Sequence, residues 1–108
     1  MIEIKFIPKE LRLSVEGHAG QAEKGKDIVC SAVSILFYTL AQAIVDSADL
    51  LEEEPVINIE DGNGIVSCKP KQTFLGTIQR TYWTILTGIE LLADEYKEYI
   101  NFTVEGEQ

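Results

Sequence analysis

The 108-residue sequence has little positive charge and no long apolar run, and each shortage excludes a class of protein. Nine Lys and Arg residues stand against eighteen Asp and Glu residues, a formal net charge of −9. Such a surface repels phosphate backbones, so nucleic-acid binding is disfavoured. The longest uninterrupted apolar run is four residues, 35–38, whereas a membrane-spanning helix needs about 18 or more. We therefore expect no membrane span.

Cysteine and histidine are also scarce. Cys30 and Cys68 are the only cysteines and His18 is the only histidine, so we expect neither a disulfide framework nor a metal site. The first six residues alternate like a strand and lack the basic region and apolar block of a signal peptide. These features predict a cytoplasmic protein whose cysteines are thiols. The length and the 45% apolar content predict a single domain over residues 1–108.

Apolar periodicity predicts an α+β fold with the element order ββαββαβ. Strands are indicated by alternation of apolar and polar residues, and helices by apolar residues three or four apart. The glycine and asparagine at 61–64 indicate a turn between two strands. Packing both helices on one face of a small, mostly antiparallel sheet buries every apolar stripe. The predicted strands are residues 2–6, 11–15, 56–60, 65–69 and 100–104, and the predicted helices are 27–48 and 72–98.

One pair of side chains has a spacing suited to nucleophilic catalysis. His18 follows the second predicted strand in a glycine-rich loop, and Cys30 lies three residues after Asp27, the predicted cap of the first helix. The N–H groups and dipole of a helix start favour a thiolate, and the loop is long enough to bring the imidazole close. Neutral imidazole can then accept the thiol proton, or the two groups can exist as a thiolate–imidazolium pair. A packed cysteine and an unrelated histidine fit the same two residues, and spacing alone does not decide.

Two further residues near this pair have both a functional and a structural interpretation. Asp27 could cap the helix by accepting backbone N–H groups, or it could orient His18. Ser34 lies one turn after Cys30 and therefore faces the same side of the helix. It could hold a substrate carbonyl or a water near the sulfur, or it could simply be a small packing residue. Cys68 alternates with Val66 on one strand face and is expected to fill the core.

The pattern G-H-A, then D-x-V-C, then Ser resembles the signature of the ribosomal-processing cysteine proteases, the Prp family. The resemblance covers the whole chain in length and element order, and its motif residues are Gly17, His18, Asp27, Cys30 and Ser34. It implies that Cys30 is the nucleophile and His18 its general base and acid. It implies supporting roles for Asp27 and Ser34, and a tight backbone turn at Gly17.

The resemblance also implies a substrate and an assembly. Family members remove a short N-terminal extension from ribosomal protein twenty-seven of the large subunit, cutting after an aromatic residue, and form homodimers with a small sheet and two helices. No cofactor is implied, and the oxyanion donors are expected to be the backbone N–H of Cys30 and one from the loop. An apolar specificity pocket is expected near the nucleophile. Candidates for its wall are Ile28, Phe37, Tyr38, Tyr82 and Trp83.

Charge distribution agrees with a basic substrate, and two non-enzymatic alternatives stay open. Residues 27–108 carry fourteen acidic and four basic side chains, which would attract a basic ribosomal protein, although plain solubility explains the charge equally well. One alternative is a non-catalytic ribosome-associated binding protein in which Cys30 is only packed. The other is a redox-sensing thiol protein in which Cys30 oxidises reversibly without peptide cleavage.

Overall fold

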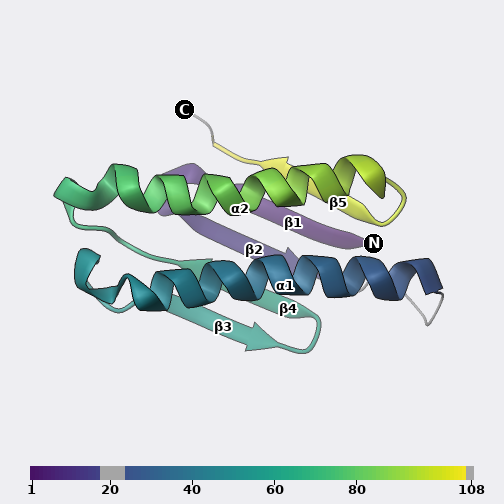
Figure 1. The fold of residues 1–108 in the computed structure, drawn as a ribbon, viewed down its shortest axis with the longest axis horizontal. Coiled ribbons are helices and arrows are strands. Elements are labelled where there is room, and N and C mark those ends of the chain that lie inside the picture. Colours follow the sequence, from purple (N-terminus) through teal and green to yellow (C-terminus); the bar gives the residue numbers. More distant parts are fainter. Residues whose placement is uncertain (18–23, 107–108) are drawn as a thin grey trace.

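Two helices lie side by side across one face of a five-stranded sheet (Figure 1). The computed structural model describes residues 1–17 and 24–106, with the backbone alone for residues 24–27. The α+β fold and the element order ββαββαβ are confirmed. In chain order the elements are β1 Ile2–Ile7, β2 Arg12–Glu16, α1 Lys24–Asp46, β3 Val56–Glu60, β4 Asn63–Ser67, α2 Leu75–Glu95 and β5 Ile100–Val104.

The sheet has the strand order β3-β4-β2-β1-β5 and is mostly antiparallel, as predicted. The pairs β1–β2, β2–β4 and β3–β4 are antiparallel, and β1–β5 is the one parallel pair among these strands. Figure 1 shows α1 lying over the β3–β4 side of the sheet and α2 over the β1–β5 side. The second hairpin therefore inserts beside β2, which brings its turn next to the end of the first hairpin.

The core forms where the inner face of the sheet meets both helices. Alternate residues of the strands point to this face, because side chains in a strand change sides at every residue. On α2 the buried side chains follow the three-or-four spacing that the sequence showed. Buried strand residues include Ile2, Ile4, Phe6, Leu13 and Val66, and buried α2 residues are Ile78, Tyr82, Ile85, Leu86 and Ile89.

Several element boundaries differ from the sequence expectation, and helices α1 and α2 end at Asp46 and Glu95 rather than at residues 48 and 98. Helix α1 begins at Lys24 rather than at Asp27, since a helix propagates through polar residues that show no apolar period. Helix α2 begins at Leu75, after a 3₁₀ turn at Gln72–Phe74. The turn between β3 and β4 is two residues long rather than four. Within it Gly62 has a φ of +81°, a conformation that suits glycine.

Helix α1 is more apolar overall than its short apolar runs indicate. By length and composition the 19 residues Ile28–Asp46 could cross a membrane, although Ser, Thr and Gln residues interrupt every apolar run. Many helices in the cores of soluble proteins have the same length and composition. Here Val29, Phe37 and Ile44 are buried against the rest of the fold, so the composition of α1 gives only weak support for a membrane span.

Candidate active site

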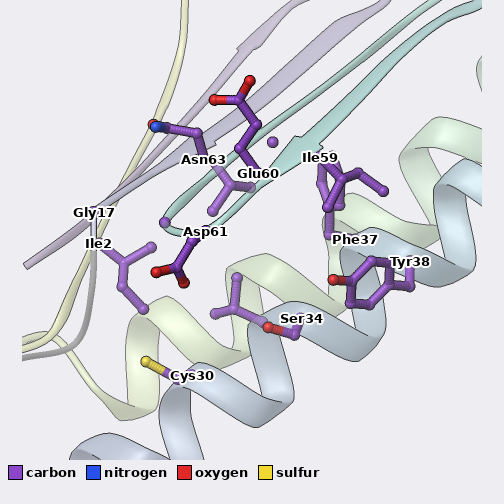
Figure 2. A pocket seen from close by; sticks show the side chains of 14 residues that line it. Ile2, Gly17, Cys30, Ser34, Phe37, Tyr38, Ile59, Glu60, Asp61 and Asn63 are labelled. Carbon is purple, nitrogen blue, oxygen red and sulfur yellow. The ribbon is translucent and has the colours of Figure 1, made fainter.

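A pocket of about 440 Å³ lies between α1 and the sheet, at the end where the β3–β4 turn meets the end of β2 (Figure 2). Three groups of residues form its wall: the inward flank of α1, the β3–β4 hairpin, and the inner face of β1 and β2. From α1 come Cys30, Val33, Ser34, Phe37 and Tyr38, from the hairpin residues 59–64, and from the first hairpin Ile2, Val15 and Gly17.

Cys30 reaches this pocket from the second turn of α1. It is the seventh residue of the helix, it is partly exposed, and its sulfur is not part of a disulfide. The expectation that Cys30 follows a helix cap at Asp27 is therefore wrong, because the helix begins three residues earlier. Only the first four N–H groups of a helix lack intrahelical partners, and the dipole acts mainly within the first turn. The backbone N–H of Cys30 is thus unsuited to be an oxyanion donor.

Ser34 lies beside Cys30 in the pocket wall, one helical turn farther along α1. Figure 2 shows both side chains on the same flank, with Phe37 and Tyr38 on the next turn. The four-residue spacing that predicted this placement is a property of the helix itself. The pocket therefore combines a thiol and a hydroxyl with an aromatic wall on one helix.

Gly17 closes the pocket at the end of β2. Its φ is +95°, and a Cβ there would lie 2.7 Å from the carbonyl oxygen of Met1, so both conformation and space require glycine. Its N–H donates to the carbonyl of Gly62 at 2.8 Å, which joins the two hairpins. His18, the next residue, lies outside the described residues, as does the side chain of Asp27.

One carboxylate lies on the hairpin side of the pocket. Glu60 and Asp61 are both exposed, and Figure 2 shows the Asp61 carboxylate directed from the turn toward the α1 side, whereas the Glu60 carboxylate points away from it. No lysine or arginine is among the described residues of the wall. The site is therefore apolar near Phe37 and negatively charged near the turn.

Of the five aromatic or aliphatic residues expected to form a specificity wall, two do so. Phe37 and Tyr38 line the pocket, while Ile28 is 62% exposed on the outer side of α1. Tyr82 is fully buried, and Trp83 packs its ring against Phe6 at 5.3 Å between ring centroids. The amphipathic pattern does not distinguish a large apolar side chain that lines the pocket from one that packs in the core or lies at the surface.

The hairpin residues of the wall were not anticipated from the sequence. The turn at 61–64 was identified as a turn, and no local signal connected it to Cys30. Its place beside Cys30 depends on β4 pairing with β2, where Val15 lies opposite Gly64. A long-range pairing of this kind is not encoded in the periodicity of either segment.

Cys68 lies outside the pocket and packs against the core. The hydroxyl of Tyr82 donates to its sulfur at 3.6 Å. Burial raises the pKa of the Cys68 thiol, and the hydrogen bond from Tyr82 offsets part of that effect. The two cysteines are therefore in different surroundings. Across residues 1–17 and 24–106 no three His, Cys, Asp or Glu side chains form a cluster suited to a metal ion.

Comparison with known proteins identifies a family that matches this geometry. Residues 1–101 match the family described as cysteine protease Prp. The chain is 31% identical over 86 residues to the ribosomal processing cysteine protease Prp of Staphylococcus aureus, in strains Mu50 and NCTC 8325. That span is 80% of this chain and 78% of the relative. Residues 1–101, which match the family, include every residue of the pocket wall.

Solved structures of Prp and of a similar protein have the same fold as this chain. Prp from S. aureus with a covalently linked product peptide superposes with a TM-score of 0.76 at 26% identity, covering 97% of this chain and 100% of that one. SMU.848 from Streptococcus mutans gives a TM-score of 0.73 at 30% identity, over 96% and 93% of the two chains. S. aureus Prp with a substrate peptide gives 0.69 at 25% identity, over 96% and 97%.

Proposed function

The chain belongs to the cysteine protease Prp family, and from that premise we propose that it removes a short N-terminal extension from ribosomal protein twenty-seven of the large subunit. It is a cysteine protease, so the non-catalytic binding protein and the redox sensor are the weaker alternatives. The observation that carries the proposal is that Cys30 lies in the wall of a pocket large enough for a peptide side chain. The proposed enzyme is one domain over residues 1–108 and acts in the cytoplasm, where ribosomal proteins are made.

Cys30 is the proposed nucleophile and His18 the proposed base. His18 accepts the thiol proton, and the sulfur attacks the scissile carbonyl to form a tetrahedral oxyanion. The C–N bond then breaks, and the imidazolium gives its proton to the leaving amine. Water, deprotonated by His18, hydrolyses the thioester and frees Cys30. Because Cys30 lies beyond the first turn of α1, this mechanism assigns thiol activation to His18 rather than to the helix dipole.

Ser34 is the proposed donor to the oxyanion. Its hydroxyl is on the same flank of α1 as Cys30, and the backbone N–H of Cys30 belongs to the helical hydrogen-bond ladder. Gly17 supports the site by turning the chain immediately before His18. Asp27 is proposed to orient His18, since the helix starts before it and its expected role as cap no longer applies.

The two ends of the pocket suit the two properties expected of the substrate. Phe37, Tyr38 and Ile59 offer an apolar surface for the aromatic residue that precedes the scissile bond. Asp61 adds negative charge where a basic ribosomal peptide would lie. The S. aureus relative has been solved with a substrate peptide and with a covalently linked product peptide, which supports peptide binding in this fold.

A homodimer is part of the proposal, and the outer face of α1 is its proposed interface. Ile28, Ile35 and Val45 are large apolar residues exposed on this face. Residues 28–45 contain no charged side chain in a chain of net charge −9. Two copies of an acidic protein repel unless they meet over an uncharged surface, and exposed apolar patches mark interaction sites.

The test is cleavage of the extended ribosomal precursor by the protein and its variants, followed by mass spectrometry. Cys30→Ala and His18→Ala should abolish cleavage, and Ser34→Ala should lower kcat by about 10²-fold, the usual cost of one oxyanion donor. Cys68→Ala is the matched control, since it removes the other thiol from outside the pocket. It should retain activity.

Cleavage that survives loss of Cys30 or His18 would refute the dyad. Inactivity of the wild-type protein on this precursor, together with activity on another peptide, would refute the substrate while keeping the protease. An effect of Ser34→Ala on KM alone would refute its oxyanion role, because a transition-state contact lowers kcat.

A further inference from the structure

Gly64 lies directly beneath Phe37, and its missing side chain leaves the space that the ring occupies. A Cβ at Gly64 would lie 2.7 Å from Cζ, 2.8 Å from Cε2 and 3.3 Å from Cε1 of Phe37. Contacts that short cannot persist, so one partner would have to move. Gly64 has no positive φ, and its backbone conformation would accept other residues. Glycine is therefore required here because the Phe37 ring occupies the space of a side chain, and not because of the backbone conformation.

On this side of the strand, Gly64 faces α1. Gly64 shares the helix-facing side of β4 with Val66, which is fully buried. Phe37 is 5% exposed, and it lies two helical turns after Cys30 on the same flank of α1. Both Gly64 and Phe37 belong to the pocket wall, and Figure 2 shows Phe37 between α1 and the hairpin. The contact between them thus sets how far the ring extends into the pocket.

A side chain at position 64 would push the Phe37 ring into the pocket. Phe37 packs on the core behind it, and protein interiors are too dense to accept a displaced ring. The pocket is the adjoining empty volume. The displaced ring would therefore fill space that a substrate side chain needs.

We propose that Gly64 is a positioning residue for substrate specificity: it seats Phe37 against β4 and so keeps the pocket deep enough for a bulky aromatic side chain of the substrate. The proposal rests on the proposed peptidase function of this site. It adds a residue outside the catalytic motif, on a strand that contributes no catalytic group, and it acts through Phe37.

The test compares peptides that differ only in the residue before the scissile bond, Phe or Ala. In Gly64→Ala, kcat/KM for the Phe peptide should fall by about 10- to 100-fold, the range for steric discrimination in an apolar pocket. The kcat/KM for the Ala peptide should change by less than about 3-fold, because its methyl group does not need the depth that the displaced ring would fill. Alkylation of Cys30 by iodoacetamide should keep its wild-type rate, because the nucleophile is not moved.

Gly76→Ala is the matched control. It makes the same chemical change at a glycine of α2 where an added Cβ meets no atom within 4 Å, and it should leave the Phe-to-Ala preference unaltered. A rescue variant tests the steric cause. Adding Phe37→Leu to Gly64→Ala removes the ring that collides, and should return the Phe peptide to the rate of Phe37→Leu alone.

Two results would overturn the proposal. One is an equal loss on the Phe and Ala peptides in Gly64→Ala, and the other is no rescue by Phe37→Leu. If Gly64→Ala does not fold, Phe37→Leu alone decides, since a shorter residue deepens the pocket and must raise cleavage of a Trp peptide relative to Phe. An unchanged Trp-to-Phe ratio would refute the idea. Wild-type cleavage of neither peptide would instead refute the proposed function.

Discussion

At the scale of single residues, the chain uses its two cysteines in opposite ways. Cys30 opens onto a pocket, whereas Cys68 packs on the core and accepts a hydrogen bond from Tyr82. Burial raises the pKa of Tyr82 well above that of a free phenol, and the nearby Cys68 raises it further. Both groups of this buried pair thus favour their neutral, protonated forms in the folded state.

This pair predicts a loss of stability in alkali. Unfolding exposes groups whose usual pKa values are 9.0 for the thiol and 10.0 for the phenol. Both pKa values are higher in the folded protein, so their stabilising contribution is complete only well below the unfolded thiol value of 9.0 and is lost progressively as pH rises through it. Urea unfolding at pH 8, 9 and 10.5 should show a steadily falling free energy of unfolding.

Tyr82→Phe should flatten that decline above pH 10, because it removes the buried group that the unfolded chain ionises. Identical slopes in the wild type and Tyr82→Phe would contradict the assignment to this phenol.

At the scale of elements, the two helices approach each other closely at one glycine. An added Cβ at Gly88 of α2 would lie 3.1 and 3.2 Å from the two terminal carbons of Leu36 on α1. Gly76, near the start of the same helix, faces open space. The two glycines of α2 therefore differ in purpose, although both weaken the helix intrinsically.

Alanine at these two positions should affect the free energy of unfolding differently. Gly76→Ala should raise the free energy of unfolding by about 0.5 kcal/mol through reduced backbone entropy of the unfolded chain. Gly88→Ala gains the same term but forces Leu36 to shift, so it should be less stable than Gly76→Ala by about 1 kcal/mol. Urea denaturation at neutral pH measures both. Equal stabilisation by the two changes would show that the helices are not in close contact at Gly88.

At the scale of the whole molecule, charge and apolar surface are separated. The acidic side chains lie largely outside α1, whose residues 28–45 are uncharged. The apolar residues on the outer face of this helix are not needed for the core, which its opposite face supplies. A second copy of the chain would cover such a face without bringing acidic groups together.

A single charge on this face should separate the copies. Ile35→Glu places a carboxylate at a position that is 62% exposed, and it should convert a dimer into a folded monomer, because burying an unpaired charge at an interface is costly. Leu91→Glu makes a comparable change at a 67% exposed position of α2 and should leave the mass unchanged. Sedimentation velocity would decide. A monomeric wild type, or a dimer that persists in Ile35→Glu, would contradict the proposed interface.

The sequence by itself determined the features that repeat locally. Alternation gave the five strands, three-or-four spacing gave the two helices, and helical geometry put Ser34 on the same flank as Cys30. It also gave the family, through a motif whose residues lie within a short stretch. These properties depend on neighbours a few positions apart, which a periodic pattern records directly.

Tertiary structure alone decided the strand order and the wall opposite Cys30. The hydrogen bond from Gly17 to Gly62 and the contact of Gly64 with Phe37 join segments far apart in the chain. Each depends on how the second hairpin inserts beside β2. Many pairings of strands satisfy the same alternation, and only the combined packing of the sheet and helices selects one of them.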